Sequence, residues 1–125
     1  MSSIPGVTVS FAGKPEIVVF SVVDRIPPEC ISLAEDAFNQ LVQRGHKFFV
    51  LDLSEARYIG SNGVGIVAYY RTILGQRGGK IVVVKAPPSV MAKIAPFIKG
   101  VLQVVDSREE AIALLQTSEY SAAQA

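Results

Sequence analysis

Short apolar runs alternate with segments of helical periodicity along most of the chain. The runs at 48–51 and 81–84 are continuous and rich in β-branched or aromatic residues, which is typical of strands buried on both faces. In the segments before, between and after these runs, apolar residues recur at i, i+3 and i+4, a spacing that predicts amphipathic helices. Helices are expected at residues 27–44, 62–76, 89–99 and 106–115, the last one capped by Asp106 or Ser107.

Strands are expected at residues 7–11, 16–23, 47–53, 80–85 and 102–105. The first two flank Ala12-Gly13-Lys14-Pro15, a sequence typical of a hairpin turn. Each later strand follows a helix, and such alternation requires right-handed crossovers and parallel pairing. The predicted fold class is therefore α/β: a mostly parallel sheet with an N-terminal antiparallel hairpin and about four helices. Ligands and partners of such sheets gather where strands end and helices begin, which here indicates the loop 54–63.

The size of the chain predicts one domain. Its 125 residues are 50% hydrophobic and 18% charged, with a mean hydropathy of +0.37, which excludes intrinsic disorder. We expect the domain to span residues 1–117 and the small polar residues 118–125 to form a disordered tail.

The chain offers no pattern of membrane insertion or export. The uncharged stretch 58–70 is interrupted by glycines, and residues 1–7 have neither a basic residue nor an apolar core of signal length. Cys30 is the sole cysteine and has no internal disulfide partner. These features favour a cytoplasmic location, although a soluble domain cut from a larger membrane protein would show the same features.

Charge is distributed unevenly along the chain. Residues 56–105 contain seven basic and no acidic side chains, although the net charge of the whole chain is only +1. This segment could present a positive face to an acidic partner; alternatively, its basic residues are solvated singly or pair with acids from elsewhere. Aromatic residues are not interleaved with the basic ones, and the pI of about 7.9 is low, so direct nucleic-acid binding is not expected.

Enzyme signatures fail on spacing or context. The segment 63–68 has the form G-x-G-x-x-A, but it lies about nine residues after its strand, and no acidic residue follows before Asp106. The segment 75–80 is one residue short of a phosphate-binding loop and precedes a strand. His46 and Cys30 have no triad partners at readable spacing, and no residues have metal-ligand spacing. We therefore expect no enzyme activity, no cofactor and no metal.

The remaining candidate is the loop and helix start Tyr58-Ile59-Gly60-Ser61-Asn62-Gly63-Val64. This segment, after a buried strand ending in Asp52-Leu53-Ser54, resembles the signature of STAS domains, the family of bacterial anti-sigma factor antagonists. The resemblance extends along nearly the whole chain, through Gly78-Gly79-Lys80, a proline-rich helix start, the step from Gly100 to Leu102, and Glu109-Glu110-Ala111.

The resemblance implies a role for each residue of this loop. Ser61 matches the serine that a partner kinase phosphorylates, Gly60 replaces the usual acidic or hydroxyl residue, and Asn62 replaces a second small residue. Ser61 is expected to be the N-cap of its helix, with a hydroxyl that accepts a backbone hydrogen bond. The predicted partner-binding residues are Tyr58, Gly60, Ser61, Asn62, Gly63, Val64 and Lys93. Lys93 is included because the helices at 62–76 and 89–99 should lie side by side, and Lys99 and Arg71 are weaker candidates.

Two functions are consistent with this reading. The first is a non-enzymatic, cytoplasmic anti-sigma factor antagonist in partner-switching control of transcription. It is a phosphoprotein that binds an anti-sigma factor with serine kinase activity. A metal-dependent serine phosphatase removes its phosphate and restores binding. The second is an unphosphorylated STAS scaffold or transporter-accessory module, because the family also contains such members and Gly60 departs from the switch motif.

Overall fold

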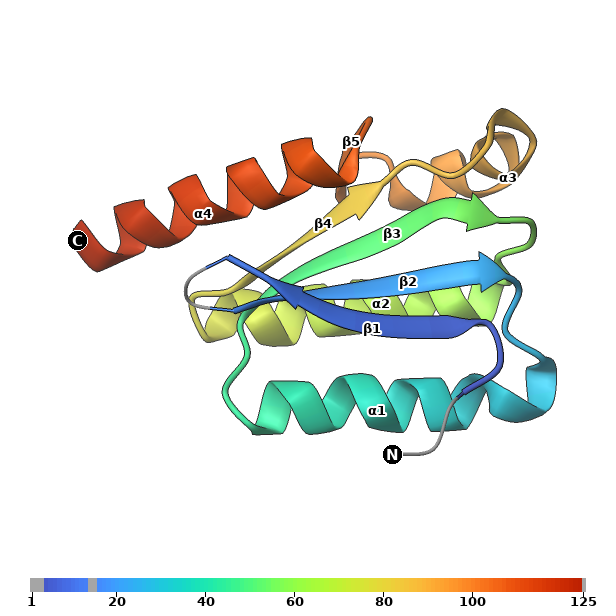
Figure 1. Cartoon of the computed structure of the whole chain (residues 1–125). Coiled ribbons are helices and arrows are strands. Elements are labelled where there is room, and N and C mark those ends of the chain that lie inside the picture. Colours follow the sequence, from blue (N-terminus) through green and yellow to red (C-terminus); the bar gives the residue numbers. More distant parts are fainter. Residues whose placement is uncertain (1–3, 14–15, 125) are drawn as a thin grey trace.

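The protein forms one five-stranded sheet with helices on both faces (Figure 1). The computed structural model describes residues 4–13 and 16–124, with side chains described as far as Thr117. The strands are β1 (Val7–Ala12), β2 (Ile17–Asp24), β3 (Phe48–Ala56), β4 (Lys80–Val84) and β5 (Gln103–Val105). They lie in the order β1-β2-β3-β4-β5, with β1 antiparallel to β2 and all other neighbours parallel. The predicted fold class is confirmed.

Four α-helices and one 3₁₀ helix connect or follow the strands. They are η1 (Pro28–Cys30), α1 (Ile31–Gln43), α2 (Ser61–Gln76), α3 (Pro88–Ile98) and α4 (Arg108–Gln124). Of the two expected caps for α4, Ser107 takes the role: its Oγ accepts a hydrogen bond from the N–H of Glu110 at 3.1 Å. The two prolines before α1 produce a short 3₁₀ turn, and the α-helix proper begins only at Ile31.

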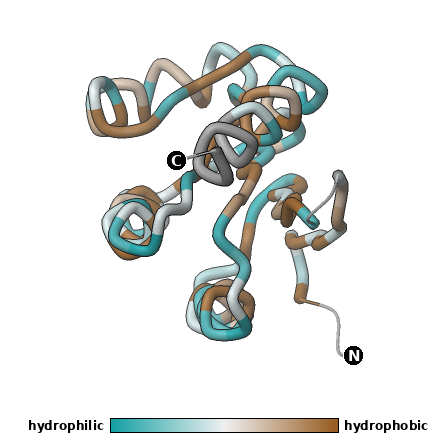
Figure 2. Tube along the Cα trace, turned by 90° about the vertical axis from the view of Figure 1, so that its left-hand side faces the viewer, coloured by the Kyte–Doolittle hydropathy of each residue, from teal (hydrophilic) through white to brown (hydrophobic). Residues whose placement is uncertain are grey.

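The sheet has two buried faces because side chains alternate along each strand. On one face Phe49 and Leu51 of β3 pack with α1, α2 and α3; on the other face Val50 of β3 packs against α4. Figure 1 shows α4 on one side of the sheet and α1 and α2 on the opposite side. Figure 2 shows hydrophobic and hydrophilic residues alternating along the helical coils, as expected for helices with one buried side.

Two element boundaries differ from the sequence prediction in ways that affect the site. β3 continues to Ala56, because Glu55 and Ala56 pair with Val23 and Asp24 at the end of β2 after an irregularity in register. The expected loop 54–63 was therefore too long, and the connection between β3 and α2 contains only residues 57–60.

The C-terminal helix extends further than expected. α4 continues beyond Leu115 to Gln124, through residues such as Ala122 and Gln124 that favour helices. The side chains of residues 118–124 and the whole of residue 125 lie outside the described residues, so the disordered tail at 118–125 stays a prediction. Over the described part of the chain, each helix is too short or too polar to cross a membrane.

Candidate functional site

The connection between β3 and α2 is fixed to the end of the neighbouring strand. The backbone N–H groups of Arg57 and Tyr58 both donate to the carbonyl of Asp24, at 2.6 and 3.3 Å. Asp24 has a φ of 62°, a left-handed conformation that Asp tolerates better than most residues. This turn of β2 holds the start of the loop, so the loop leads into α2 from a defined position.

Ser61 is the first residue of α2, and Gly60 is its N-cap. Gly60 has an extended backbone, with φ −83° and ψ 162°, and its carbonyl accepts the first helical hydrogen bond from the N–H of Val64 at 3.2 Å. No side chain caps α2. The expectation that the Ser61 hydroxyl acts as the N-cap was wrong, because the change from extended to helical backbone occurs one residue earlier.

This arrangement leaves polar groups available around Ser61. Since the first helical bond comes from Val64, the N–H groups of Ser61, Asn62 and Gly63 have no partner inside the helix. Uncapped N–H groups at a helix N-terminus create a partial positive charge that favours an anion. A phosphate on Ser61 would be placed beside these groups.

The loop and the first turn of α2 are mostly accessible. Tyr58 is 56% exposed, Ser61 and Asn62 are exposed, and Gly60 and Gly63 are half-buried. Val64, the next residue, is buried in the core and supports the turn from below. An accessible strip is therefore formed by five of the residues proposed from the sequence, namely Tyr58, Gly60, Ser61, Asn62 and Gly63. Val64 is buried beneath it.

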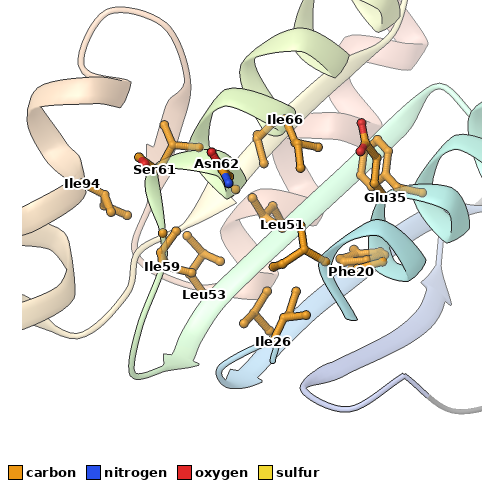
Figure 3. Close-up of a pocket in the computed structure, with 18 of the residues that line it drawn as sticks. Phe20, Ile26, Glu35, Leu51, Leu53, Ile59, Ser61, Asn62, Ile66 and Ile94 are labelled. Atoms are coloured by element: carbon orange, nitrogen blue, oxygen red, sulfur yellow. The ribbon is translucent and has the colours of Figure 1, made fainter. Parts of the chain in front are cut away.

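Helix α3 lies next to this strip. Ile94 of α3 and Ser61 of α2 line the same pocket, and Figure 3 shows them on neighbouring helices. Lys93 is exposed, as is Phe97, one helical turn further on and 62% exposed. Residues four apart share a helix face, so Lys93 and Phe97 together form an exposed basic and aromatic patch on α3.

Phe97 is a candidate that the sequence does not reveal. Val90, Ile94 and Ile98 are the buried residues of α3, and Phe97 fits the same apolar periodicity because i+3 and i+4 positions both continue a helical stripe. Only the tilt of α3 on the sheet decides that Ile98 is buried and Phe97 is not.

The basic residues of the segment 56–105 behave in two ways. Lys85 forms an exposed ion pair with Asp106 at 3.1 Å, and Arg77 donates to the carbonyl of Val42 at 3.3 Å. Within the described residues, Lys93 forms no ion pair, and the same holds for Lys99 and Arg71. Lys85 therefore pairs with an acid from outside the segment, as the alternative interpretation expected, whereas Lys93 remains free to meet an acidic partner.

A polar network underlies the end of β3. Asp52 is 5% exposed; its Oδ1 accepts hydrogen bonds from the N–H of Ser54 at 2.9 Å and from its hydroxyl at 2.6 Å. Its Oδ2 accepts from Arg108, which also donates to Ser21 Oγ at 3.2 Å. Burial acts to raise the pKa of the Asp52 carboxyl, but the hydrogen bonds from Ser54 and Arg108 outweigh burial and hold this pKa below its ordinary value.

The network explains part of the sequence motif. Asp52 and Ser54 both lie within β3, so the two hydrogen bonds between them brace an extended strand rather than a turn. Arg108 was not expected, because 56 residues separate it from Asp52 and no local pattern joins them. The network is structural: it fixes the strand that leads into the loop.

The family-model comparison agrees with this fold and loop. Residues 8–111 match the STAS domain model, so the chain belongs to the STAS domain family. A search of curated proteins found no match.

Solved structures of similar fold include several anti-sigma factor antagonists. An anti-sigma factor antagonist from Mycobacterium paratuberculosis has a TM-score of 0.74 and 23% identity, with 92% of this chain and 99% of that chain covered. The anti-sigma factor antagonist SpoIIAA in its unphosphorylated form has a TM-score of 0.73 and 17% identity, covering 88% and 97%. TM1081 from Thermotoga maritima has a TM-score of 0.77 and 16% identity, covering 88% and 94%. At these identities the similarity establishes the fold.

Proposed function

We propose that the protein is a regulatory protein-binding module, an anti-sigma factor antagonist controlled by phosphorylation of Ser61. Its partners are an anti-sigma factor with serine kinase activity and a metal-dependent serine phosphatase, and it acts in the cytoplasm without catalysing a reaction itself. The observation that carries the proposal is the position of Ser61: exposed, at the first position of α2, and without a capping hydrogen bond. The solved anti-sigma factor antagonists of the same fold support it.

The geometry gives the phosphate a clear physical effect. A phosphoserine adds about −1.5 to −2 charges at neutral pH. The uncapped N–H groups of α2 tolerate this charge, so the fold remains intact. Ser61 lies within the accessible strip, so a partner that contacts the strip also contacts the new charge. Phosphorylation therefore changes the binding surface rather than the fold.

The experiment is phosphorylation of the full chain by a candidate partner kinase and ATP, followed by intact-mass measurement. We expect one phosphate on the wild type and on Ser89→Ala, and none on Ser61→Ala. Ser89 is a matched control because it is also an exposed serine in the first turn of a helix. A phosphate on Ser61→Ala would contradict the assignment.

The second candidate, an unphosphorylated STAS scaffold or transporter-accessory module, is favoured by Gly60 in place of the usual acidic or hydroxyl residue. The structure makes Gly60 a weaker argument for this second candidate. A Cβ built on Gly60 would meet the Tyr58 hydroxyl at 3.5 Å and the Tyr58 ring at 3.6 Å, which is ordinary van der Waals contact, so the backbone does not require glycine here. Failure of every candidate kinase to modify the wild type would favour the second candidate.

A further inference from the structure

A pocket lies between α1, α2 and the sheet, directly beneath the loop that carries Ser61 (Figure 3). Its volume is about 280 Å³, close to the lower end of the range of roughly 300–1,000 Å³ found for small-molecule sites. Protein interiors contain few voids larger than a water molecule, so a space of this size beside the core is unusual. The walls are mostly apolar and include Phe20, Ile26, Leu51, Leu53, Ile59 and Ile66.

Among the described residues, one charged side chain lines this pocket. Glu35 of α1 lies on its wall, and no lysine, arginine or histidine is among the residues lining it. Glu35 is half-buried, and in the described part of the chain it forms neither an ion pair nor a side-chain hydrogen bond. A carboxylate in apolar surroundings gains most from a charged hydrogen-bond donor that comes with the ligand.

Tyr70 of α2 also lines the pocket, as do the polar residues Tyr58, Ser61 and Asn62 of the loop and helix start. Burial raises the pKa of its phenol, and the nearby carboxylate of Glu35 raises it further, so Tyr70 stays neutral and keeps its hydroxyl proton. Its ring and that of Phe38 also line the pocket, with centroids 4.9 Å apart. Both rings are buried, with Phe38 also stacked on Phe49 at 4.3 Å, so they form a rigid apolar wall of the pocket.

We propose that this pocket binds a small primary amine with an apolar body. The ammonium group pairs with Glu35, and the apolar body extends between Phe20, Leu51 and Ile66 toward the loop. A carboxylate ligand fits less well, because Glu35 would repel it. The proposal concerns binding alone and does not depend on phosphorylation of Ser61.

The test compares three probes with one apolar body and different heads: 2-phenylethylamine, 2-phenylethanol and 3-phenylpropionate. Each is titrated into the isotopically labelled full chain, and chemical shifts of the amides around the pocket are followed. A charge-assisted hydrogen bond is worth about 1.5–3 kcal/mol, so we expect the amine to bind at least about tenfold more tightly than the alcohol. The carboxylate is expected to bind most weakly.

Two variants locate the head group. Glu35→Gln keeps the shape of the side chain and is expected to remove the difference between amine and alcohol. Asp36→Asn is the matched control, since Asp36 is the next residue of α1, exposed and outside the pocket; it should leave the difference unchanged. The proposal is overturned if the three probes bind equally, if the carboxylate binds most tightly, if Glu35→Gln retains the preference, or if no amide around the pocket shifts.

Discussion

The guanidinium of Arg108 donates two hydrogen bonds to Oδ2 of Asp52, from Nε at 3.0 Å and from Nη2 at 2.8 Å. This contact joins the first residue of α4 to the middle of the sheet. Asp52 lies opposite Ser21 in the β2–β3 register, and Arg108 contacts both. The strand that leads to the Ser61 loop is thus anchored from the face opposite to α1 and α2.

Loss of Arg108 should destabilise the fold. Arg108→Gln leaves the buried carboxylate of Asp52 without its charged partner. The side chain of Arg108 is 45% exposed, so we expect a loss of about 1–2 kcal/mol rather than the roughly 3–5 kcal/mol of a fully buried pair. Urea unfolding measures this difference. Lys85→Gln, which breaks the exposed pair with Asp106, is the control and should change the free energy of unfolding by less than about 0.5 kcal/mol.

The same pair should make stability fall in acid. The pKa of Asp52 is lowered in the folded state, so its contribution is fully present above the ordinary carboxyl pKa of about 4 and is lost as the pH falls through the lowered value. In Arg108→Gln the loss of stability in acid should be smaller, because the pKa of Asp52 is lowered less without the Arg108 guanidinium. An identical pH profile for wild type and variant would show that Arg108 does not hold the Asp52 carboxylate.

Replacement of Gly60 tests the geometry of the helix start. Gly60→Asp places a capping carboxylate at the N-cap of α2, where the backbone is already extended and a Cβ makes ordinary van der Waals contact with Tyr58. We expect the free energy of unfolding to rise by a few tenths to about 1 kcal/mol. Gly60→Ala is the control and should lower it by several tenths of a kcal/mol, since alanine is less favourable than glycine at an N-cap. Equal stability of the two variants would mean that α2 begins elsewhere.

The hydropathy pattern predicted the type and order of the elements because the buried runs 48–51 and 81–84 are too apolar and too short for anything but central strands. Their ends were less predictable. The last residues of β3, Glu55 and Ala56, are held by pairing with β2, a tertiary contact that local pattern does not report. The N-cap of α2 was likewise predicted one residue too late, at Ser61 instead of Gly60.

The site was predictable where it follows the local motif and not where it depends on packing. Tyr58, Ser61 and Asn62 lie within five consecutive residues and were recognised together. Arg108 supports the site only because α4 packs where it does, and Phe97 is exposed only because α3 buries Ile94 and Ile98 instead. No short-range pattern could have assigned Phe97 to the surface.

Phe97 should contribute to partner binding rather than to stability. Phe97→Ala removes a side chain that is 62% exposed, so the free energy of unfolding should change by no more than about 0.5 kcal/mol. Aromatic residues at the centre of an interface often contribute about 2 kcal/mol or more, so partner affinity should fall at least about tenfold by calorimetry. Leu33→Ala, at a 54% exposed position on α1, is the control and should leave affinity unchanged. A larger loss of affinity for Leu33→Ala than for Phe97→Ala would place the interface on α1.

Lys93 should accelerate association with an acidic partner. We expect Lys93→Glu to slow association in stopped-flow experiments at low salt, and the defect to shrink between about 0.05 and 0.5 M salt as the charges are screened. Lys47→Glu makes the same charge change at the opposite end of β3 and should have little effect. Equal rates for wild type and Lys93→Glu at low salt would leave the patch without a steering role.

A negative charge at Ser61 should weaken binding without harming the fold. Ser61→Asp places a carboxylate in the first turn of α2, where the helix dipole favours it, so stability should stay the same or rise by up to about 1 kcal/mol. Partner affinity should fall, because the charge enters the accessible strip. A large drop in melting temperature with unchanged affinity would show that the loop is structural.

The most direct test is the affinity of the partner for the unmodified chain and for the chain phosphorylated at Ser61, measured by calorimetry on the same preparation before and after modification. The account predicts a loss of at least about tenfold on phosphorylation, with the melting temperature unchanged and with Ser61→Ala, carried through the same treatment, keeping the unmodified affinity. Equal affinity for the phosphorylated and unmodified chains would contradict it.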